Sequence, residues 1–315
     1  MKVITTDLWF PEGPVWLGDG SLLVVEIRRQ TLTRIWLNGR KSIVATLGGG
    51  PNGAAIGPDG YCYVCNNGGF RWQCREDGSV VNAGQADDYV TGRIERVNIE
   101  TGKFDVLYDQ CDGIALRGPN DLVFDAFGGF YFSDPGKARP RETDRGCVYY
   151  AKADGSFIKP LIFPISVPNG MGLSPDGKTL YVTETETARL WAWDLADPGE
   201  LVTKPVMTSK SPHGGKLIHI SPVYARFDSL KVEASGNICL ANLDRGGITV
   251  VTPDGAQASF VPVPGDTHIT NLCFGQPDMK TAYVTQAYSG CLVEMDWPRP
   301  GLLLNHSSLT HLHSQ

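Results

Sequence analysis

The sequence predicts an all-β protein, a six-bladed β-propeller with four antiparallel strands per blade. Three observations support this prediction: one hairpin pattern recurs six times, its spacing is that of propeller blades, and oxygen-bearing side chains hold the same place in each copy. The chain has 315 residues, of which 42% are hydrophobic and 20% are charged. Such a length suits one ring of six blades, so we expect a single domain over residues 1–315.

The repeated hairpin consists of a polar residue, a short apolar strand, a tight turn and a second apolar strand. The clearest copy spans residues 117–134, where Gly128 and Gly129 provide the turn. Five further copies begin near Pro11, Pro51, Pro168, Phe227 and Ile269. A period of roughly 40–50 residues with a hairpin in each unit is typical of propeller blades. Two longer intervals indicate insertions after the second and fourth hairpins.

One polar position is shared by all six hairpins, at the start of the first strand. Its occupants carry a carboxylate or an amide oxygen: Glu12, Asn52, Asn120, Asn169, Asp228 and Asn271. The first strand of each blade lines the central channel, so these side chains should face one another around the axis. Asn and Asp also form turns before strands. That alternative explains one or two of the six more readily than all of them.

The first and last repeats indicate how the ring closes. The segment Val3–Trp9 reads as a strand without a partner in the first blade, which extends to about Leu47. The sixth repeat has strands at Thr281–Val284 and Cys291–Met295 but lacks an outer strand. We therefore expect the N-terminal strand to close the last blade, which removes the open edges of the array.

Two insertions and the tail depart from the repeat. The insertion of the second blade runs Asn66-Asn67-Gly68-Gly69-Phe70-Arg71-Trp72 and continues as a polar stretch to Tyr89. We expect a loop that overhangs the channel and presents Arg71 and Trp72 to a ligand, with a plain surface loop as an equal alternative. Residues 211–220 form a second candidate lid, and residues 300–315 are expected to be a loosely ordered tail.

Composition excludes several classes of function. The net charge of −6 and the absence of basic runs argue against nucleic acid as a partner. No apolar stretch has the length of a signal or membrane-spanning segment, so we expect a cytoplasmic protein that does not bind a membrane. Cys62 and Cys65 have zinc-motif spacing, but residues three apart in a strand point to opposite faces and cannot chelate together. Nothing in these patterns indicates an oligomeric state.

The repeated openings resemble the family of senescence marker protein, gluconolactonase and luciferin-regenerating enzyme. The resemblance rests on four motifs and covers essentially the whole chain: Glu12-Gly13-Pro14-Val15-Trp16, Gly118-Pro119-Asn120-Asp121, Pro168-Asn169-Gly170-Met171 and Thr270-Asn271-Leu272-Cys273-Phe274-Gly275. It implies a six-bladed propeller that hydrolyses lactones with one divalent cation in the channel. Ca²⁺ is the first choice, and Mg²⁺, Mn²⁺, Zn²⁺ and Fe²⁺ are alternatives. The family's metal ligands fall on Glu12, Asn120 or its immediate shell, Asn169 and Asp228.

The residue chemistry agrees with this implication. Two carboxylates and Asn carbonyls form a hard-oxygen site, in which a cation can polarise a lactone carbonyl while a carboxylate activates water. Asp228 is the family's usual catalytic base, and Asp121 is the second candidate. We expect the substrate to be bound near the channel mouth by Asn67, Arg71, Trp72, Arg117, Asn120 and His268. At that place His268 could bind or protonate a leaving alkoxide, and a position in a surface turn is the alternative.

Departures from the family pattern leave the substrate open. Arg117 stands three residues before Asn120, where sugar lactonases often have Arg two residues before, and Asp228 is followed by Ser rather than Gly. These differences allow a less polar lactone than gluconolactone. Two other functions remain as alternatives: hydrolysis of aryl esters or organophosphates by the same fold and metal, and a non-catalytic binding scaffold. A scaffold would have no reason to keep Glu12, Asn169 and Asp228 together.

Overall fold

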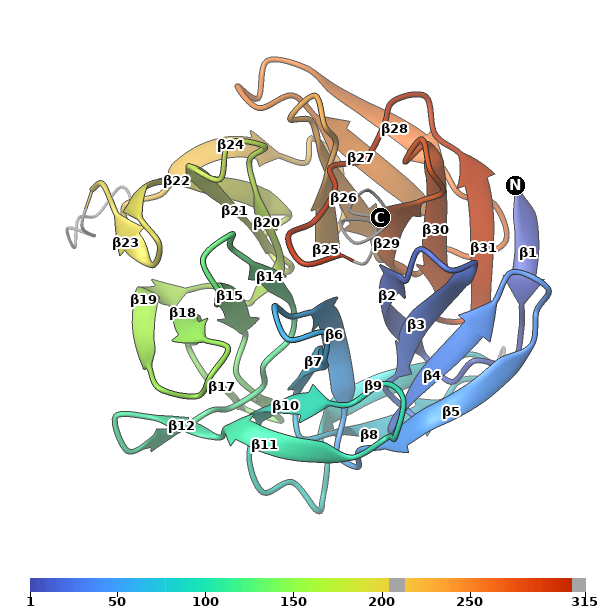
Figure 1. Cartoon of the computed structure of the whole chain (residues 1–315), viewed down its shortest axis with the longest axis horizontal. Helices are drawn as coiled ribbons and strands as arrows, with labels where there is room; N and C mark the ends of the chain where they lie inside the picture. The colour runs from blue at the N-terminus through green and yellow to red at the C-terminus, as the bar shows by residue number, and fades with distance from the viewer. Residues whose placement is uncertain (77, 204–212, 308–315) are drawn as a thin grey trace.

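The computed structural model describes residues 1–76, 78–203 and 213–307, and it confirms the expected six-bladed propeller (Figure 1). Six antiparallel sheets stand around a central channel, and no helix occurs among the described residues. It follows that none of these residues forms a helix able to cross a membrane. We call the end of the channel where the inner strands begin the upper face, and the end where they finish the lower face.

The first three blades follow the chain from the channel outward. Blade 1 contains β2 (Pro11–Trp16), β3 (Ser21–Glu26), β4 (Thr31–Trp36) and β5 (Lys41–Thr46). Blade 2 contains β6 (Pro51–Ile56), β7 (Cys62–Asn66), β10 (Arg93–Val97) and β11 (Phe104–Tyr108). Blade 3 contains β14 (Leu122–Phe124), β15 (Gly129–Asp134), β18 (Gly146–Lys152) and β19 (Ile158–Ile165).

The other three blades complete the ring. Blade 4 contains β20 (Pro168–Leu173), β21 (Thr179–Glu184), β22 (Arg189–Asp197), the short β23 (Glu200–Leu201) and β24 (Lys216–Ile220). Blade 5 contains β25 (Phe227–Val232), β26 (Ile238–Asn242), β27 (Gly247–Val251) and β28 (Ala258–Pro262). Blade 6 contains β29 (Ile269–Gly275), β30 (Thr281–Gln286), β31 (Cys291–Asp296) and β1 (Lys2–Thr5). Three small hairpins stand outside the blades: β8 (Phe70–Cys74) with β9 (Val80–Gln85), β12 (Gln110–Cys111) with β13 (Ile114–Ala115), and β16 (Ala138–Arg139) with β17 (Glu142–Thr143).

The N-terminal strand closes the ring, as expected. β1 pairs with β31 in antiparallel register, with Lys2 opposite Glu294. The Lys2 ammonium also donates to the Glu294 carboxylate at 3.0 Å. The strand is shorter than the expected segment, because it ends at Thr5 and the chain then turns toward the upper end of blade 1. Blade 6 thus consists of three strands from the C-terminal part of the chain and one from the N-terminus, and β1 covers the edge that β31 would otherwise leave open.

The hydrophobic core is divided among the six interfaces between neighbouring blades. Each blade alternates its side chains between two faces, and each face packs on the next blade. Trp16 of blade 1 stacks on Tyr283 of blade 6 with ring centroids 5.3 Å apart. Cys62 belongs to the cluster between blades 1 and 2, and Cys65 to the cluster between blades 2 and 3. These two thiols therefore point to opposite faces, as the strand periodicity predicted.

A β-bulge marks the polar position in five of the six inner strands. The register shifts within Glu12–Val15, Pro51–Ala54, Pro168–Met171, Phe227–Leu230 and Ile269–Asn271. In blade 3 the strand proper begins only after Asn120 and Asp121. A bulge re-aims a side chain without ending the strand. This local irregularity lets each inner strand present a polar group to the channel and then resume its apolar packing.

Glycines let the inner strands approach backbone to backbone at this level. A Cβ atom on Gly53 would lie 2.4 Å from the Asn120 carbonyl oxygen, and one on Gly170 would lie 2.4 Å from the Leu230 nitrogen. No side chain fits at such distances. The glycine that follows the polar residue is therefore a packing requirement of the narrow channel.

The tail corrects one expectation. Residues 300–307 were expected to be loosely ordered, but residues 299–307 follow a fixed path across the lower face, and we call them the strap (Figure 1). The Leu302 nitrogen donates to Val232 of blade 5 at 2.9 Å, and the Asn305 amide donates to Phe124 of blade 3 at 3.0 Å. Residues 308–315 lie outside the described part of the chain.

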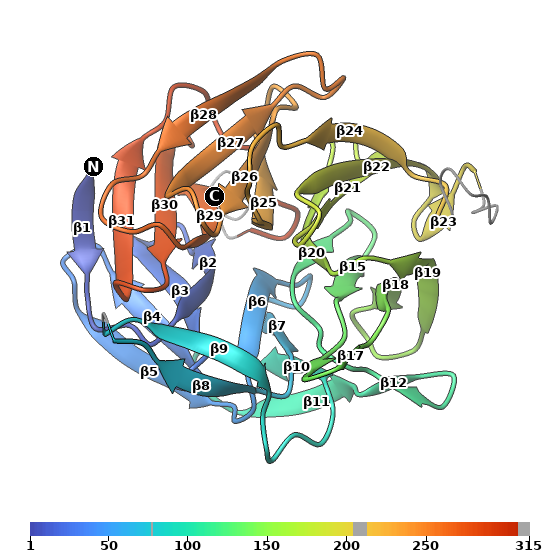
Figure 2. The ribbon, with the colours of Figure 1, turned by 180° about the vertical axis from the view of Figure 1, so that it is seen from behind.

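The two insertions form different structures. Residues 70–74 and 80–85 form the hairpin β8–β9, which lies over blade 1 on the upper face (Figure 2). The second candidate lid is not a lid in its described part, because residues 216–220 form β24, the outer strand of blade 4, with His219 opposite Leu190. Alternating apolar residues in this segment favour a strand, and residues 211 and 212 lie outside the described residues.

Candidate active site

The four residues expected to bind a metal come from the upper ends of the inner strands of four blades. Glu12 lies on β2, Asn169 on β20 and Asp228 on β25, while Asn120 precedes β14. Glu12 and Asp228 are 2% and 8% exposed, and Asn169 lies beside the Asp228 carboxyl group. Buried carboxylates are costly unless they are paired or bind a cation. The channel concentrates such groups at one level.

Two amide oxygens in this group lack the partners that buried oxygens normally have. The Oδ1 atoms of Asn120 and Asn169 are buried and accept no hydrogen bond among the described residues. An unpaired carbonyl oxygen beside carboxylates fits a hard cation. Within residues 1–76, 78–203 and 213–307 no three His, Cys, Asp or Glu side chains cluster closely enough to hold a metal by themselves. A cation here would therefore depend on the Asn oxygens.

The Glu12 carboxylate accepts hydrogen bonds from two neighbouring side chains, one at each oxygen. Its Oε1 atom accepts from the Ser229 hydroxyl at 2.9 Å, and its Oε2 atom accepts from the Asn271 amide at 2.8 Å. Burial raises the pKa of Glu12 to about 7, assisted by the charge of Asp121 and opposed by Asn271. Burial, followed by the charge of Glu12, raises the pKa of Asp228 well above its usual range. A cation between these carboxylates would relieve their repulsion.

Asp121 lies next to the group but has different partners. Its Oδ1 atom accepts from the Leu122 nitrogen at 2.9 Å, and its Oδ2 atom lies 3.8 Å from the Lys231 ammonium. Burial raises the pKa of Asp121, and Lys231 opposes this rise. The sequence patterns assigned no role to Lys231 or to the Ser229 hydroxyl. The sequence feature that could have indicated a role for Lys231 is its place between the apolar residues Leu230 and Val232 of an inner strand.

An aromatic wall stands at the channel mouth, made of Phe10, Trp72, His268 and Tyr288. The Phe10 ring lies 5.0 Å from that of Trp72 and 5.7 Å from that of His268, and His268 stacks on Tyr288 at 4.1 Å. The structure thus brings Trp72 and His268 together although 196 positions separate them in the sequence. Both were expected near the mouth.

His268 is a neutral imidazole with a defined tautomer. Its Nδ1 atom lies 2.7 Å from the Leu243 carbonyl oxygen, which can only accept, so Nδ1 carries the proton and Nε2 is an acceptor. Burial, with Arg226 as the next cause, lowers the pKa of His268 to about 4. The imidazole is therefore suited to accept a hydrogen bond near neutral pH and poorly suited to protonate a leaving alkoxide.

Asn67 also lies at the mouth. Its side chain is 2% exposed and faces Gly50, two residues before Asn52. The Oδ1 atom accepts from the Gly69 nitrogen at 2.8 Å, whereas the buried Nδ2 atom has no hydrogen-bond partner among the described residues. The Lys137 ammonium holds the Asn67 carbonyl at 2.8 Å. Asn67 thus offers one amide donor from a fixed position.

The structure does not bring the two arginines into this group. Arg71 points to the opposite face of β8 from Trp72, where it donates to the Ala83 carbonyl at 3.2 Å and lies 3.7 Å from the Asp87 carboxylate. The Arg117 side chain is exposed, and its backbone nitrogen donates to Asp134 at 2.8 Å. Alternation along a two-stranded hairpin accounts for the orientation of Arg71.

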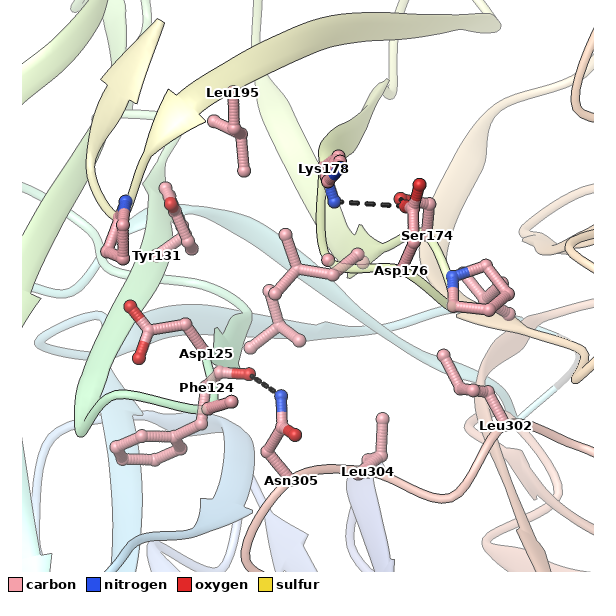
Figure 3. Close-up of a pocket in the computed structure, with 18 of the residues that line it drawn as sticks. Phe124, Asp125, Tyr131, Ser174, Asp176, Lys178, Leu195, Leu302, Leu304 and Asn305 are labelled. Atoms are coloured by element: carbon pink, nitrogen blue, oxygen red, sulfur yellow. Dashed lines mark hydrogen bonds between the residues drawn. The ribbon is translucent and has the colours of Figure 1, made fainter.

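The cavities of the lower face are separate from this group. One of them measures about 420 Å³ between blades 3 and 4, and the strap covers it (Figure 3). Figure 3 shows Leu302, Leu304 and Asn305 of the strap along one side of the cavity, with the Asn305 amide bonded to the Phe124 carbonyl. Lys231 lines this cavity and the smaller one next to it. Lys231 therefore lies between the buried carboxylates and the lower face.

Comparison with known proteins places the chain in a family. A family model described as the SMP-30/gluconolactonase/LRE-like region matches residues 10–288. The chain belongs to this family. The resemblance inferred from the four motifs is thereby confirmed.

Relatives of the SMP-30/gluconolactonase/LRE-like family include curated lactonases. A gluconolactonase of Zymomonas mobilis is 24% identical over 313 residues, with 92% of this chain and 79% of the relative covered. The lactonase drp35 of Staphylococcus haemolyticus is 27% identical over 276 residues, with 84% and 75% covered.

Solved structures share the fold. A gluconolactonase from Xanthomonas campestris superposes with a TM-score of 0.72 at 21% identity, covering 94% of this chain and 89% of that one. A calcium-binding protein, regucalcin, from Agrobacterium tumefaciens superposes with a TM-score of 0.70 at 20% identity, covering 96% and 100%. The family relationship supports lactone hydrolysis as the general activity.

Proposed function

We propose that the protein is a divalent-metal-dependent lactonase whose active centre is the upper part of the channel. The observation that carries this proposal is the presence, among the described residues, of two buried Asn oxygens without partners, those of Asn120 and Asn169, together with the buried carboxylates of Glu12 and Asp228. A binding scaffold does not need buried acceptors without donors, because each one costs free energy. A hydrolase that binds a cation does need them.

Glu12, Asn120, Asn169 and Asp228 would hold the cation. When bound, the ion would polarise the lactone carbonyl and lower the energy of the developing oxyanion. All four side chains offer oxygen, which favours Ca²⁺ first and Mg²⁺ or Mn²⁺ next. The structural neighbour regucalcin is a calcium-binding protein, which supports Ca²⁺ as the first choice.

A carboxylate would take the proton from the attacking water. Asp228 is one candidate, and Asp121 is the other because it lies beside the ion-binding group and is paired with Lys231. The Nε2 atom of His268 would accept a hydrogen bond from water or from a substrate hydroxyl. The free Nδ2 donor of Asn67 would bind an oxygen of the lactone ring.

The aromatic wall supports a ring-bearing or otherwise apolar substrate. Phe10, Trp72 and Tyr288 offer ring faces, whereas a sugar lactone would call for several polar contacts. The same wall favours aryl esters as the second candidate class. Esters and lactones share the carbonyl chemistry, so only a direct comparison separates them.

The test is a substrate panel on purified protein. Acid release would be measured with polar and apolar lactones, and hydrolysis with aryl esters and fluorophosphates, before and after treatment with a chelator. We expect the highest kcat/KM with an apolar lactone, loss of activity on chelation, and recovery with Ca²⁺ or Mn²⁺. Activity that survives complete metal removal would overturn the proposal. A higher kcat/KM for aryl esters than for lactones would identify the protein as an aryl esterase instead.

A further inference from the structure

Two positions of the channel differ from the repeat, and their side chains touch. The residue directly after the polar position is Asp121 in blade 3 and is uncharged in the other five blades. The uncharged residues are Gly13, Gly53, Gly170, Ser229 and Leu272. The residue three places after the polar position is Lys231 in blade 5 and is apolar in the other five blades. The apolar residues are Val15, Ala55, Val123, Gly172 and Phe274. The chain thus adds one carboxylate and one ammonium to the channel, each in a single blade.

These two groups form a buried pair across the channel. The Lys231 ammonium lies 3.8 Å from the Asp121 carboxylate, and the two side chains are 13% and 2% exposed. The ammonium also donates to the Asn271 amide oxygen at 3.1 Å and to the Leu230 carbonyl at 3.0 Å. With these partners, the lysine ammonium is held beside the Asp121 carboxylate.

The pair is connected to the candidate metal ligands. Asn271 accepts from Lys231 and donates to the Glu12 carboxylate at 2.8 Å. Arg226, the other cation near Asp228, is neutralised by Asp244, to which its guanidinium donates at 2.8 and 2.9 Å. The groups that set the charge of the centre are therefore Glu12, Asp228, Asp121 and Lys231.

We propose that Lys231 is a positioning residue that cancels the charge of Asp121, so that the centre keeps a net charge of −2 and selects a divalent over a trivalent cation. Three buried carboxylates alone would carry −3 and would favour a trivalent ion. The lysine also holds Asp121 on the lower side of the group, toward β25 and away from the channel mouth. The inference rests on the proposed metal-dependent function and adds the charge selectivity of its centre.

The test measures ion binding rather than catalysis. Chelator-treated full-length protein would be titrated with Ca²⁺ and with Tb³⁺, two ions of similar size and different charge, by calorimetry and by terbium luminescence. Five proteins are compared: the parent, Lys231→Met, Lys231→Arg, Asp121→Asn and the double variant of Lys231→Met with Asp121→Asn. Because the ions differ by one unit of charge, we expect the ratio of Tb³⁺ to Ca²⁺ affinity to rise by about tenfold in Lys231→Met.

The double variant and a conservative change complete the design. The double variant restores the net charge of −2, so its affinity ratio should return to that of the parent. Lys231→Arg keeps the charge and should leave the ratio unchanged, even if it lowers stability. An unchanged ratio in a folded Lys231→Met protein, or a ratio in the double variant like that of Lys231→Met, would overturn the role of Lys231. A parent that binds neither ion would instead reject the proposed metal centre, and the inference with it.

Discussion

At the scale of single residues, Asp121 and Asp228 differ in what surrounds their oxygens. Asp228 lies against Glu12 and Asn169, the residues proposed to hold the cation. Asp121 has its own cation in Lys231 and a backbone donor in Leu122. Loss of the Asp228 charge should therefore weaken binding of the cation strongly, whereas loss of the Asp121 charge should weaken it less.

This difference gives a prediction about the catalytic base. If Asp228 removes the proton from water, Asp228→Asn should reduce kcat by about 10²–10⁴-fold even when the metal is saturating. If Asp121 is the base, Asp121→Asn should show that loss, and Asp228→Asn should act mainly through weaker metal binding. The measurement is kcat against metal concentration for both variants. A fall of less than about tenfold in both would reject both assignments.

A second residue-scale prediction concerns pH and His268. Its folded-state pKa of about 4 is depressed below the usual 6.5, so the associated stability is complete above pH 6.5 and is lost as the pH falls toward 4. His268→Asn keeps a donor for the Leu243 carbonyl but does not titrate. Between about pH 7.5 and pH 4 the parent should lose about 3 kcal/mol of unfolding free energy relative to His268→Asn.

Urea unfolding of both proteins at each pH provides the measurement for His268. Protonation of the channel carboxylates affects the two proteins equally and cancels in the difference. A difference that stays constant across this range would mean that His268 is solvated and charged in the folded protein.

At the scale of elements, the hairpin β8–β9 separates two side chains by strand alternation. Trp72 packs on Phe10 at the channel mouth, while its neighbour Arg71 faces the Asp87 side. The hairpin therefore offers a substitution at the candidate site and a matched control one residue away. Few fold elements allow so local a comparison.

Trp72→Ala should change substrate preference more than ion binding. Removal of the ring opens the wall, so kcat/KM for apolar or aryl substrates should fall by about tenfold relative to that for a small polar lactone. Calcium affinity should stay within about twofold of the parent, because the Trp72 ring packs on Phe10 and Phe70, which are not proposed ligands. Arg71→Ala is the control and should leave both quantities unchanged. Equal losses for all substrates with Trp72→Ala would indicate a folding defect instead.

At the scale of the whole molecule, the strap ties distant blades together. The fully buried Glu233 carboxylate of blade 5 accepts from the Arg299 guanidinium at 2.9 Å and from the Trp297 indole at 2.7 Å. Beyond this anchor the strap reaches Phe124 of blade 3. A ring of blades that contact only their neighbours thereby gains a connection across its lower face.

Loss of the anchor should lower the stability of the ring. Arg299→Met leaves the buried Glu233 carboxylate without its cation, and we expect a loss of about 2 kcal/mol, reduced by the remaining donors to Glu233 and by the partial exposure of Arg299. Adding Glu233→Gln to this variant should recover part of the loss. Urea unfolding would measure both, and equal stability of Arg299→Met and the parent would show that the strap does not support the ring.

The sequence by itself determined the six blades, the closing N-terminal strand and the level of the polar residues. It could do so because each hairpin is encoded locally and six copies reinforce one another. Local patterns failed where a segment had no repeat to align with, as in β24 and the strap. Their pairing depends on surfaces provided by other blades.

The role of each polar residue depends on contacts that form only in the folded ring. Asn169 and Asn271 occupy the same position in their repeats, yet Asn271 bonds to Glu12 whereas the Asn169 oxygen has no partner. The pairing of Lys231 with Asp121 likewise joins blades 5 and 3 across the channel. Such contacts depend on distances between inner strands that are far apart in the chain, and a repeat pattern contains no information about those distances.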